Sequence, residues 1–571
     1  MIREFLQTHW KAYLAGIMFL AGIDYLQILV PKYTGDVVNI VIKPPVDLKI
    51  ILNYVILIVL IAGGVVVGRF IWRMFIVGGA RKFQKYAQQS LFDKFLISPI
   101  TFFDKNSTGN LMAYFNNDIP AVSQMLSQGV IMTVDAIAMT VFVFAGMLTV
   151  VDYKLVLISL IPLPFVALSS WYFGGKIHTR FKKVQTDFSF ISQRAQESFS
   201  NVKTIKSYGV EKKFEKLFYK ECDKFARDNF SLLNISAVYG PLISFLAALT
   251  TAIAIFLGGQ MVISGSVNLG DFVAFISYLG MLTWPFVAIG QVINVVQMGR
   301  ASSERIEVLM KTENRKDDGI PFPGKFKTLE IKGLDFYYDD AKVLSDINLN
   351  ITAGQKVAII GRIGCGKTTL AKLLTKLYDV ERGKIFYNGV DIRDIESQSL
   401  RENVLLIPQD SFLFSTKISK NVAFGLEQFS EDDVEDASKI SHFHEEVVKL
   451  DKKYDTLIGE KGVTLSGGQR QRLTLARGLF KDAGLILLDD VLSAVDSQTA
   501  SMILEDINKM LKDMTVLVIT HNIASIKNSD IIFVMDEGKI VESGTHEELM
   551  KSDGFYHKLF MIQQIEREIG H

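Results

Sequence analysis

The sequence predicts a multi-domain membrane protein in which a six-helix all-α transmembrane domain is followed by a soluble α/β domain. Three observations predict this fold class. Nearly all long uncharged runs of the 571 residues lie before residue 300, and they are long enough for six bilayer crossings. The remaining residues have mixed charge and several short apolar runs, which is typical of buried parallel strands. One of these runs leads directly into a Gly-rich loop and an apolar helix.

The transmembrane domain is expected over residues 1–311. A helix in hydrocarbon must satisfy its own backbone hydrogen bonds, so each span needs about 20 mostly apolar residues. Four spans are separate runs, whereas the last two share a long apolar region that is interrupted at Asp271. Residues before the first span predict a short amphipathic helix rather than a cleaved signal peptide. The expected spans cover residues 12–31, 51–74, 129–151, 155–175, 240–263 and 272–296.

Lysine and arginine are concentrated in the two long loops, residues 76–128 and 176–238, while the opposite loops are nearly free of them. The positive-inside rule therefore predicts a multi-pass protein of the cell membrane, plasma or inner, with both termini and the long loops in the cytoplasm. The long loops are expected to be helical extensions of the spans that each turn back once. We expect these turns at residues 114–120 and 187–193, within reach of a cytoplasmic domain.

Two carboxylates, Asp24 and Asp135, lie within the expected spans. A charge in hydrocarbon is costly, so each side chain should face the bundle interior or a water-filled cavity. Two interpretations remain open for these residues. One is a role in a path through the membrane, and the other is a structural hydrogen bond near a helix end or kink.

The composition excludes several classes of protein. The net charge of +1 shows no basic excess, so we expect no nucleic-acid partner. The two cysteines, Cys222 and Cys365, lie far apart in segments expected to be cytoplasmic, so we expect neither a disulfide framework nor a zinc site. We assign Cys365 no redox role and interpret it as a small residue that its loop tolerates.

A charged segment rich in Gly and Pro, residues 312–327, predicts a linker, and the soluble domain is expected over residues 328–571. Four apolar runs predict its buried parallel strands. These runs cover residues 357–360, 485–488, 516–519 and 531–535. The first three lead directly into segments whose polar residues are suited to chemistry.

The first strand runs into a complete phosphate-binding loop, whose glycines let backbone amides wrap phosphate groups. Lys367 should reach the β and γ phosphates, and the hydroxyl of Thr368 should bind Mg²⁺. The second strand ends at Asp489, which is placed to hold Mg²⁺ directly or through water, and Asp490 follows it. The sequence therefore predicts an α/β P-loop domain with these nucleotide-binding residues: Gly361, Arg362, Ile363, Gly364, Cys365, Gly366, Lys367, Thr368 and Thr369.

A second Gly-rich segment precedes the strand that ends at Asp489. It consists of Ser466, Gly467, Gly468 and Gln469, and basic residues follow it. A serine and two glycines at a helix start form an anion-binding nest, so two phosphate cradles in one chain indicate a composite site. The alternative is a Gly-rich turn that only caps a helix, and the phosphate loop in the same domain favours the first interpretation.

The order of these motifs resembles the ATP-binding cassette of ABC transporters: the phosphate loop, Gln409 in LIPQD, the segment LSGGQ, LILLDD, Ser493 to Asp496 in SAVD, and His521 in VITHN. Six spans before a cassette in one chain resemble a half-transporter of the ABC exporter type. The resemblance covers almost the whole chain. It is highly specific in the soluble half, and in the membrane half it depends on span number, loop lengths and segments such as FFDKNSTGNL and ESFSNVKTIKSYGVE.

The resemblance implies ATP and Mg²⁺ as cofactors and gives further residues a role. Tyr338 would stack on adenine, although an ordinary surface tyrosine remains the alternative. Gln409 would contact Mg²⁺ and the attacking water, and His521 would contact the γ phosphate. The LSGGQ segment would close over ATP held by the other cassette of a pair, so one active pump would need two cassettes. Ser493 to Asp496 would line the interface between the two cassettes.

One position departs from the family pattern. Where the family has a glutamate that polarises the attacking water, this chain has Asp490. A side chain shorter by one methylene withdraws the carboxylate by about an ångström, which can cost on the order of 100-fold in rate. Because LSGGQ is intact, the chain resembles the degenerate-site subunit of a heterodimeric multidrug-type exporter, whose partner is a different half-transporter chain with the catalytic glutamate. A homodimer that is merely slow is the alternative.

The expected function is ATP-driven transport of a small hydrophobic or amphipathic substrate, a drug or lipid, out of the cytoplasm or inner leaflet. The expected mechanism is alternating access, in which an ATPase activity is coupled to transmembrane transport. Export is implied by the resemblance alone, so an importer on the same fold remains an alternative. A regulatory subunit that binds ATP without pumping is the other alternative, and it too is compatible with Asp490.

Overall fold

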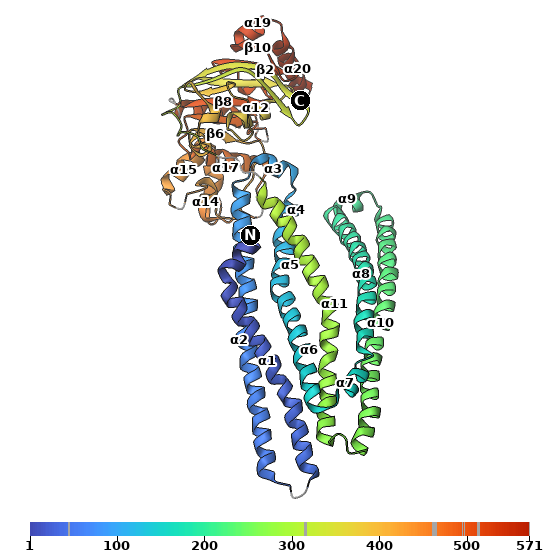
Figure 1. Cartoon of the computed structure of the whole chain (residues 1–571). Coiled ribbons are helices and arrows are strands. Elements are labelled where there is room, and N and C mark those ends of the chain that lie inside the picture. Colours follow the sequence, from blue (N-terminus) through green and yellow to red (C-terminus); the bar gives the residue numbers. More distant parts are fainter. Residues whose placement is uncertain are drawn as a thin grey trace. The chain divides into compact units, whose positions relative to one another are not determined.

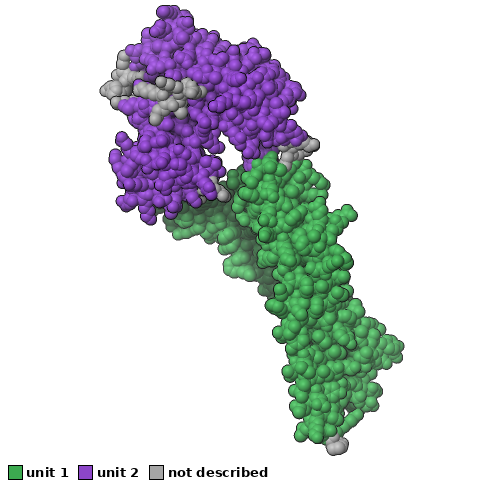
Figure 2. Space-filling model, turned by 90° about the vertical axis from the view of Figure 1, so that its left-hand side faces the viewer, with its two compact units in different colours: residues 1–97, 106–313 green, residues 98–105, 314–571 purple. Residues whose placement is uncertain are grey.

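A computed structural model describes residues 1–43, 46–312, 317–426, 428–459, 465–493, 495, 497–510 and 514–569. The chain forms two compact units, which Figure 2 colours separately. The first unit comprises residues 1–97 and 106–313, and the second comprises residues 98–105 and 314–571. Of the expected linker, residues 313–316 lie outside the described residues. Each unit is treated below by itself.

The first unit is all helical and contains six helical runs that are long and apolar enough to cross a membrane. This confirms the six-helix transmembrane domain. Two runs are divided by short irregular or π-helical turns, and Figure 1 shows how the runs lie side by side. The helices are α1 Ile2–Ile42, α2 Leu48–Leu96, α4 Thr108–Ala113, η1 Tyr114–Asp118, α5 Ile119–Gln124, η2 Met125–Gly129, α6 Val130–Val150, α7 Tyr153–Ser159, α8 Leu163–Ser200, α9 Val202–Ser207, α10 Glu211–Ile263 and α11 Leu269–Lys311.

The amino-terminal residues do not form a separate helix. They are the first turns of α1, which continues without a break into the first span. The sequence shows no Gly or Pro between residues 2 and 15 that would end a helix there. The prediction of a short separate lead-in helix was therefore wrong in its extent.

The first of the two predicted turns lies before the predicted position. Helix α2 ends at Leu96, and the returning run begins at Thr108, where the hydroxyl of Ser107 caps α4 by accepting from the backbone N–H of Asn110. The chain breaks here because a residue that precedes proline, Ser98 in this case, disfavours the helical conformation. The prediction of a turn at residues 114–120 was wrong. That stretch is helical, and it absorbs Pro120 through a wide π-helical turn.

The second of the two predicted turns lies after the predicted position. Helix α8 runs unbroken through residues 187–193, so the prediction of a turn there was wrong. No Gly or Pro interrupts this stretch, and Asp187 instead forms an ion pair of 2.7 Å with Lys224 of the antiparallel helix α10. The chain turns at α9 and Gly209, whose φ of +63° is in the left-handed region that favours glycine.

The second unit is built around a six-stranded sheet of order β10-β9-β3-β8-β7-β6. All four predicted strands are confirmed as neighbours in this sheet, and they pair in parallel. The sequence analysis missed a fifth parallel strand and an antiparallel edge strand. The strands are β3 Lys356–Gly361, β6 Val404–Ile407, β7 Leu485–Asp489, β8 Thr515–Thr520, β9 Ile531–Asp536 and β10 Lys539–Gly544.

A smaller antiparallel sheet of order β2-β1-β4-β5 completes the α/β unit. Residues of both sheets and of the helix after β3 share one apolar core, in which Leu329, Ile359 and Leu370 are fully buried. The strands are β1 Thr328–Tyr338, β2 Ala341–Thr352, β4 Ile385–Tyr387 and β5 Val390–Asp391. The helices are α12 Lys367–Leu374, α13 Ser397–Asn403, α14 Ile418–Val422, α15 Glu431–Ile440, α16 His444–Val448, α17 Gly467–Leu479, α18 Ser497–Met510, α19 His546–Lys551 and α20 Phe555–Ile569.

The segment 98–105 belongs to this soluble unit although it lies between two membrane helices in the chain. It contains the short helix α3, Ile100–Lys105. The carboxylate of Asp104 accepts a hydrogen bond of 2.7 Å from the hydroxyl of Tyr378, and Lys105 lies 3.8 Å from Asp339. The soluble unit therefore holds a piece of chain that continues covalently into α2 on one side and α4 on the other.

Candidate functional site

The parallel strands end at one edge of the large sheet, and a cavity of about 210 Å³ lies there. Residues that follow β3, β6, β7 and β8 line it, because the carboxyl ends of parallel strands meet at the same edge. The cavity brings together most residues that the sequence analysis selected. Its lining includes Gly364, Gly366, Lys367, Thr368, Thr369, Gln409, Asp489, Asp490 and His521.

The loop between β3 and α12 requires glycine at particular positions. Gly364 and Gly366 have φ values of +84° and +100°, in the left-handed region that other residues rarely adopt. A Cβ atom on Gly366 would lie 2.7 Å from a methyl carbon of Leu344, and one on Gly361 would lie 2.1 Å from a backbone oxygen. These glycines let the loop close tightly and direct its backbone amides, with the first turn of α12, toward a phosphate group.

The ammonium group of Lys367 lies over this loop. It donates hydrogen bonds of 2.8 Å to the carbonyl of Gly361 and 2.7 Å to that of Arg362. Of the other predicted loop residues, Ile363 also lines the cavity and is 92% exposed. The guanidinium of Arg362 lies over the ring of Phe555, 5.2 Å from its centre. The side chain of Arg362 is therefore engaged with Phe555, and this residue would offer a phosphate its backbone.

Two side chains at the floor of the cavity suit a divalent metal. The hydroxyl of Thr368 donates to a carboxylate oxygen of Asp489 at 3.1 Å, and Asp489 is only 2% exposed. Burial raises the pKa of Asp489 above its ordinary value, while the hydrogen bond from Thr368 opposes that rise. A poorly hydrated carboxylate gains more than an exposed one from a bound cation.

This donor set fits Mg²⁺. Among the described residues, no group of three or more His, Cys, Asp or Glu side chains could hold a metal ion. The hydroxyl of Thr368, the carboxylate of Asp489 and the amide oxygen of Gln409, which also lines the cavity, are hard oxygen donors. Mg²⁺ takes few protein ligands of this kind and completes its shell with phosphate oxygens and water. The site therefore suits a metal that arrives with a nucleotide.

The three residues predicted to be catalytic contact one another. Asp490 adopts a left-handed φ of +49°, and both of its carboxylate oxygens lie 3.1 Å from Nδ1 of His521. The side-chain amide of Gln409 donates to the same carboxylate at 3.4 Å, and the hydroxyl of Thr520 does so at the same distance. These donors hold the short aspartate at the cavity wall and fix the direction in which it points.

The LSGGQ segment lies elsewhere in the unit. Ser466 caps α17: its hydroxyl oxygen accepts from the backbone N–H of Gln469 at 3.2 Å, and the side chain of Gln469 accepts from the backbone N–H of Ser466 at 2.8 Å. The segment therefore does cap the helix. The cap leaves the backbone amides of Gly467 and Gly468 available for an anion. None of residues 466–469, all of them described, lines the phosphate cavity of their own chain.

The loop after β7 lies beside α17. The side-chain amide of Gln471 donates to the hydroxyl of Ser493 at 3.0 Å. This contact joins the helix that follows LSGGQ to the start of the SAVD segment. The predictions for Ala494 and Asp496 concern residues outside the part of the chain that the structure describes.

Tyr338 ends β1 and is half-buried. Its ring packs edge to face against those of Phe336 and Tyr378, with centres 5.0 and 5.3 Å apart. The sequence analysis missed Tyr378 and its partner Asp104, because it placed the first turn too late in the chain. The Ser98-Pro99 pair was the signal that would have located this turn.

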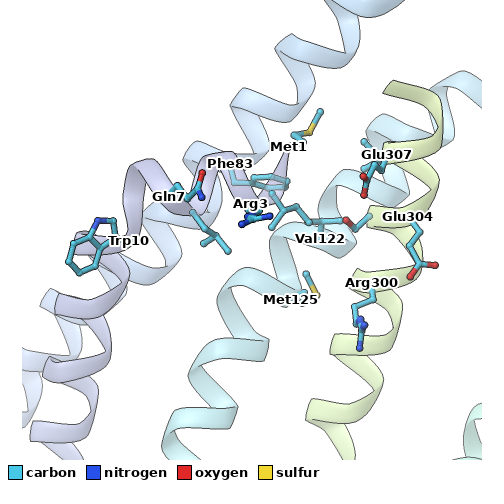
Figure 3. A pocket seen from close by; sticks show the side chains of 14 residues that line it. Met1, Arg3, Gln7, Trp10, Phe83, Val122, Met125, Arg300, Glu304 and Glu307 are labelled. Carbon is cyan, nitrogen blue, oxygen red and sulfur yellow. The ribbon is translucent and has the colours of Figure 1, made fainter. Parts of the chain in front are cut away.

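The membrane unit contains a larger cavity of about 930 Å³. It lies between the first turns of α1 and residues of α2, α5 and α11. Figure 3 shows Arg3, Phe83 and Val122 converging on it, with Arg300 and Glu304 on α11. A lining that mixes apolar, cationic and acidic side chains suits an amphipathic molecule.

Comparisons with known proteins match both units. A family profile described as ABC transporter transmembrane region matches residues 13–286, and one described as ABC transporter matches residues 344–493. The multidrug resistance-like ATP-binding protein MdlA of Buchnera aphidicola is 33% identical to this chain over 567 residues, which cover 98% of this chain and 97% of that protein.

Other relatives are similarly related. The probable multidrug resistance ABC transporter ATP-binding/permease protein YheI of Bacillus subtilis is 31% identical, with 98% of this chain and 97% of that protein covered. The ATP-dependent lipid A-core flippase of Syntrophus aciditrophicus is 33% identical, with 84% and 80% covered. The solved structure of a bacterial Atm1-family ABC exporter with ATP bound matches 98% of this chain and 99% of that chain. Its TM-score of 0.76 at 23% identity shows a shared fold.

Proposed function

The chain belongs to the ABC transporter family, with an exporter-type membrane domain fused to an ATP-binding cassette, and on this premise we propose that it exports a small hydrophobic or amphipathic molecule. Family membership makes the chain an ATP-binding, multi-pass membrane protein and an ATPase. The proposed cargo is a drug or lipid, moved out of the cytoplasm or inner leaflet by alternating access. The mixed lining of the 930 Å³ cavity and the multidrug and lipid names of the relatives support this cargo class.

The contacts in the 210 Å³ cavity support a division of roles among its residues. The loop amides and Lys367 would bind the phosphates of ATP, and Tyr338 would stack on adenine. Asp490 would polarise the attacking water, and Gln409 and His521 would orient its carboxylate. Gln409 would also contact the attacking water, and His521 would contact the γ phosphate.

Thr368, Asp489 and Gln409 would hold Mg²⁺. When bound, the metal would neutralise negative charge on the β and γ phosphates. Asp489 contributes a buried carboxylate for this purpose, and the hydroxyl of Thr368 fixes its orientation through their hydrogen bond of 3.1 Å.

The observation that carries the proposal for assembly is the separation of LSGGQ from the phosphate cavity of its own chain. An anion-binding nest that does not face the chain's own nucleotide can complete the site of a second cassette. Asp490 makes the chain's own site slow, so we propose that the second cassette belongs to a different chain that carries a catalytic glutamate. A slow homodimer is the competing assembly. Since ATP is cytoplasmic, the cassette and both termini would face the cytoplasm.

The assembly is tested by ATPase assays on the purified chain, alone and with candidate partner half-transporters. We expect slow turnover alone and fast turnover in the correct pair. Lys367→Ala in this chain should leave much of the pair's hydrolysis, whereas the matching change in the partner should abolish it. Robust turnover by the chain alone that is lost on Asp490→Asn would refute the unequal pair.

The direction of transport is tested with the active assembly in membrane vesicles. ATP-dependent accumulation in inside-out vesicles is expected for an exporter. ATP-dependent uptake into whole cells would instead show an importer. ATP-dependent closure of the cassettes without transport of any compound would show a regulatory subunit.

A further inference from the structure

The membrane unit contains a pair of acidic side chains that the ATPase mechanism does not use. Asp24 of α1 is 1% exposed, and its oxygen Oδ2 has no hydrogen-bond partner. The carboxyl group of Asp135, on α6, is close enough to Asp24 for the two groups to interact. Asp135 is only half-buried, so part of its surface is accessible. The two residues come from different helices, 111 positions apart in the sequence.

The neighbours of this pair do not neutralise it. The indole N–H of Trp284, on α11, donates to Oδ2 of Asp135 at 3.1 Å. Because the indole is uncharged, this hydrogen bond does not neutralise the carboxylate. Arg69 of α2 is the one basic side chain whose charge acts on Asp24. Its guanidinium is exposed and donates to the side chain of Gln27 at 3.3 Å rather than to a carboxylate. The pair therefore lacks a contacting cation among the described residues.

Two facing carboxylates in a low-dielectric region are unfavourable when both are ionised, so such a pair holds a proton or binds a cation. A metal ion that takes three or more of its ligands from His, Cys, Asp or Glu is a poor match, because no third such side chain joins the pair in the described part of the chain. An organic cation needs fewer ligands and also gains from aromatic faces. One such face is present: Trp284 is 49% exposed, and its indole N–H contacts Asp135.

We propose that Asp24, Asp135 and Trp284 form a recognition site for the cationic group of an amphipathic substrate. The carboxylates supply the charge and the indole supplies a flat apolar contact, while α1, α6 and α11 hold the three residues. This inference rests on the proposed function, because it names the class of cargo that the exporter would carry. Neutral and anionic amphipaths of the same size should be poor ligands for this site.

The test measures binding, which requires neither ATP nor a partner chain. The full-length chain is placed in phosphatidylcholine nanodiscs, and binding of tetraphenylphosphonium is measured by equilibrium dialysis against empty nanodiscs. Triphenylphosphine oxide is the uncharged probe. We expect saturable binding of the cation, with a dissociation constant that rises by about 30-fold in Asp24→Asn and in Asp135→Asn. Binding of the uncharged probe should change little.

The matched control is Asp47→Asn. Asp47 caps α2 outside the spans, and asparagine caps helices as well as aspartate, so the same chemical change there should leave binding unchanged. Asp135→Glu should retain most of the affinity, because it keeps the charge. The Asn variants could fail to fold, so a second measurement uses the unaltered chain. Tetraphenylphosphonium should slow the modification of Asp24 or Asp135 by a hydrophobic carbodiimide. Mass spectrometry measures this modification.

Several results would overturn the inference. These are no saturable binding of the cation, equal binding by the Asn variants, an equal loss of affinity for the uncharged probe, and no protection from the carbodiimide. Failure of the proposed function looks different. ATP-driven pumping of a neutral amphipath without cation binding would refute the recognition site alone, whereas cation binding without export by any active assembly would refute the export function alone.

Discussion

Asp490 is the residue on which we expect the catalytic rate of this chain to depend. Its carboxylate accepts from His521, Gln409 and Thr520, so its position is set by three donors on other segments. Because the side chain is one methylene shorter than glutamate, its oxygens stay close to the sheet edge. A water molecule that attacks the γ phosphate would therefore be held less well.

We predict that Asp490→Glu raises the ATPase rate of the chain or of its pair by about 10- to 100-fold, because the added methylene carries the carboxylate about an ångström further into the cavity. Steady-state phosphate release measures the effect. Asp482→Glu is the matched control, since it makes the same change at an exposed residue between α17 and β7. An unchanged rate in Asp490→Glu would show that the aspartate does not limit hydrolysis.

A second prediction concerns the phosphate loop. Gly366→Ala adds a Cβ that would lie 2.7 Å from Leu344 at a φ of +100°, so ATP affinity should fall by about 100-fold or more as the loop shifts. Binding of a fluorescent ATP analogue gives the readout. Gly383→Ala is the control. Gly383 has a φ of +81°, but nothing lies within 4 Å of the added Cβ, so this substitution strains the backbone without a steric clash. Equal losses in both variants would attribute the effect to strain alone.

At the scale of single elements, α17 combines two tasks. Its first turn is closed by a capping box between Ser466 and Gln469, and the same turn is proposed to contact ATP in a second cassette. Helix α19 carries a comparable box between Thr545 and Glu548, outside the residues that line the phosphate cavity. The two helices therefore allow capping to be separated from nucleotide contact.

We predict that Ser466→Ala and Thr545→Ala each destabilise the protein by about 1 kcal/mol, since both remove a capping oxygen. Only Ser466→Ala should also lower the ATPase rate of the assembled pump, by about tenfold or more. Chemical denaturation and ATPase assays measure the two effects. If Thr545→Ala lowered the rate as strongly, the role of Ser466 would be capping alone.

The elements also show where sequence analysis succeeds. The four predicted strands were found because buried parallel strands are continuous apolar runs, a signal contained within a few residues. The two predicted turns were wrong because a long cytoplasmic helix and a turn have similar polar composition. Their positions depend on details such as Ser98-Pro99 and on the pairing of Asp187 with Lys224 in a neighbouring helix.

At the scale of the whole molecule, the main feature is the short segment through which the two units are connected covalently. Segment 98–105 packs in the soluble unit and continues into α2 and α4 of the membrane unit. Burial and the hydrogen bond to Asp104 raise the pKa of the Tyr378 hydroxyl above its ordinary value, so this group stays a donor at neutral pH. We therefore expect a change of the cassette to be passed to two membrane helices through this short segment.

We predict that Tyr378→Phe leaves ATP affinity within about twofold but lowers transport per ATP hydrolysed by about threefold or more, because it removes the hydrogen bond to Asp104 at a cost of about 1 kcal/mol. Parallel assays of hydrolysis and transport in vesicles measure this ratio. Tyr454→Phe, which removes a hydrogen bond of 2.9 Å to His444 within the soluble unit, should keep the ratio unchanged. An unchanged ratio in Tyr378→Phe would contradict a coupling role for the segment.

The six spans, the α/β cassette, the phosphate loop and the aspartate at position 490 could all be predicted from the amino-acid sequence. Each of these is a local feature, since the length of an apolar run or the spacing of a motif needs no knowledge of distant residues. Which distant groups meet became known only from the folded structure. It joined Asp490 to Gln409, 81 positions away, brought Asp24 beside Asp135, and placed LSGGQ outside its own phosphate cavity. Such contacts depend on how helices and strands cross, and that packing is determined by the chain as a whole.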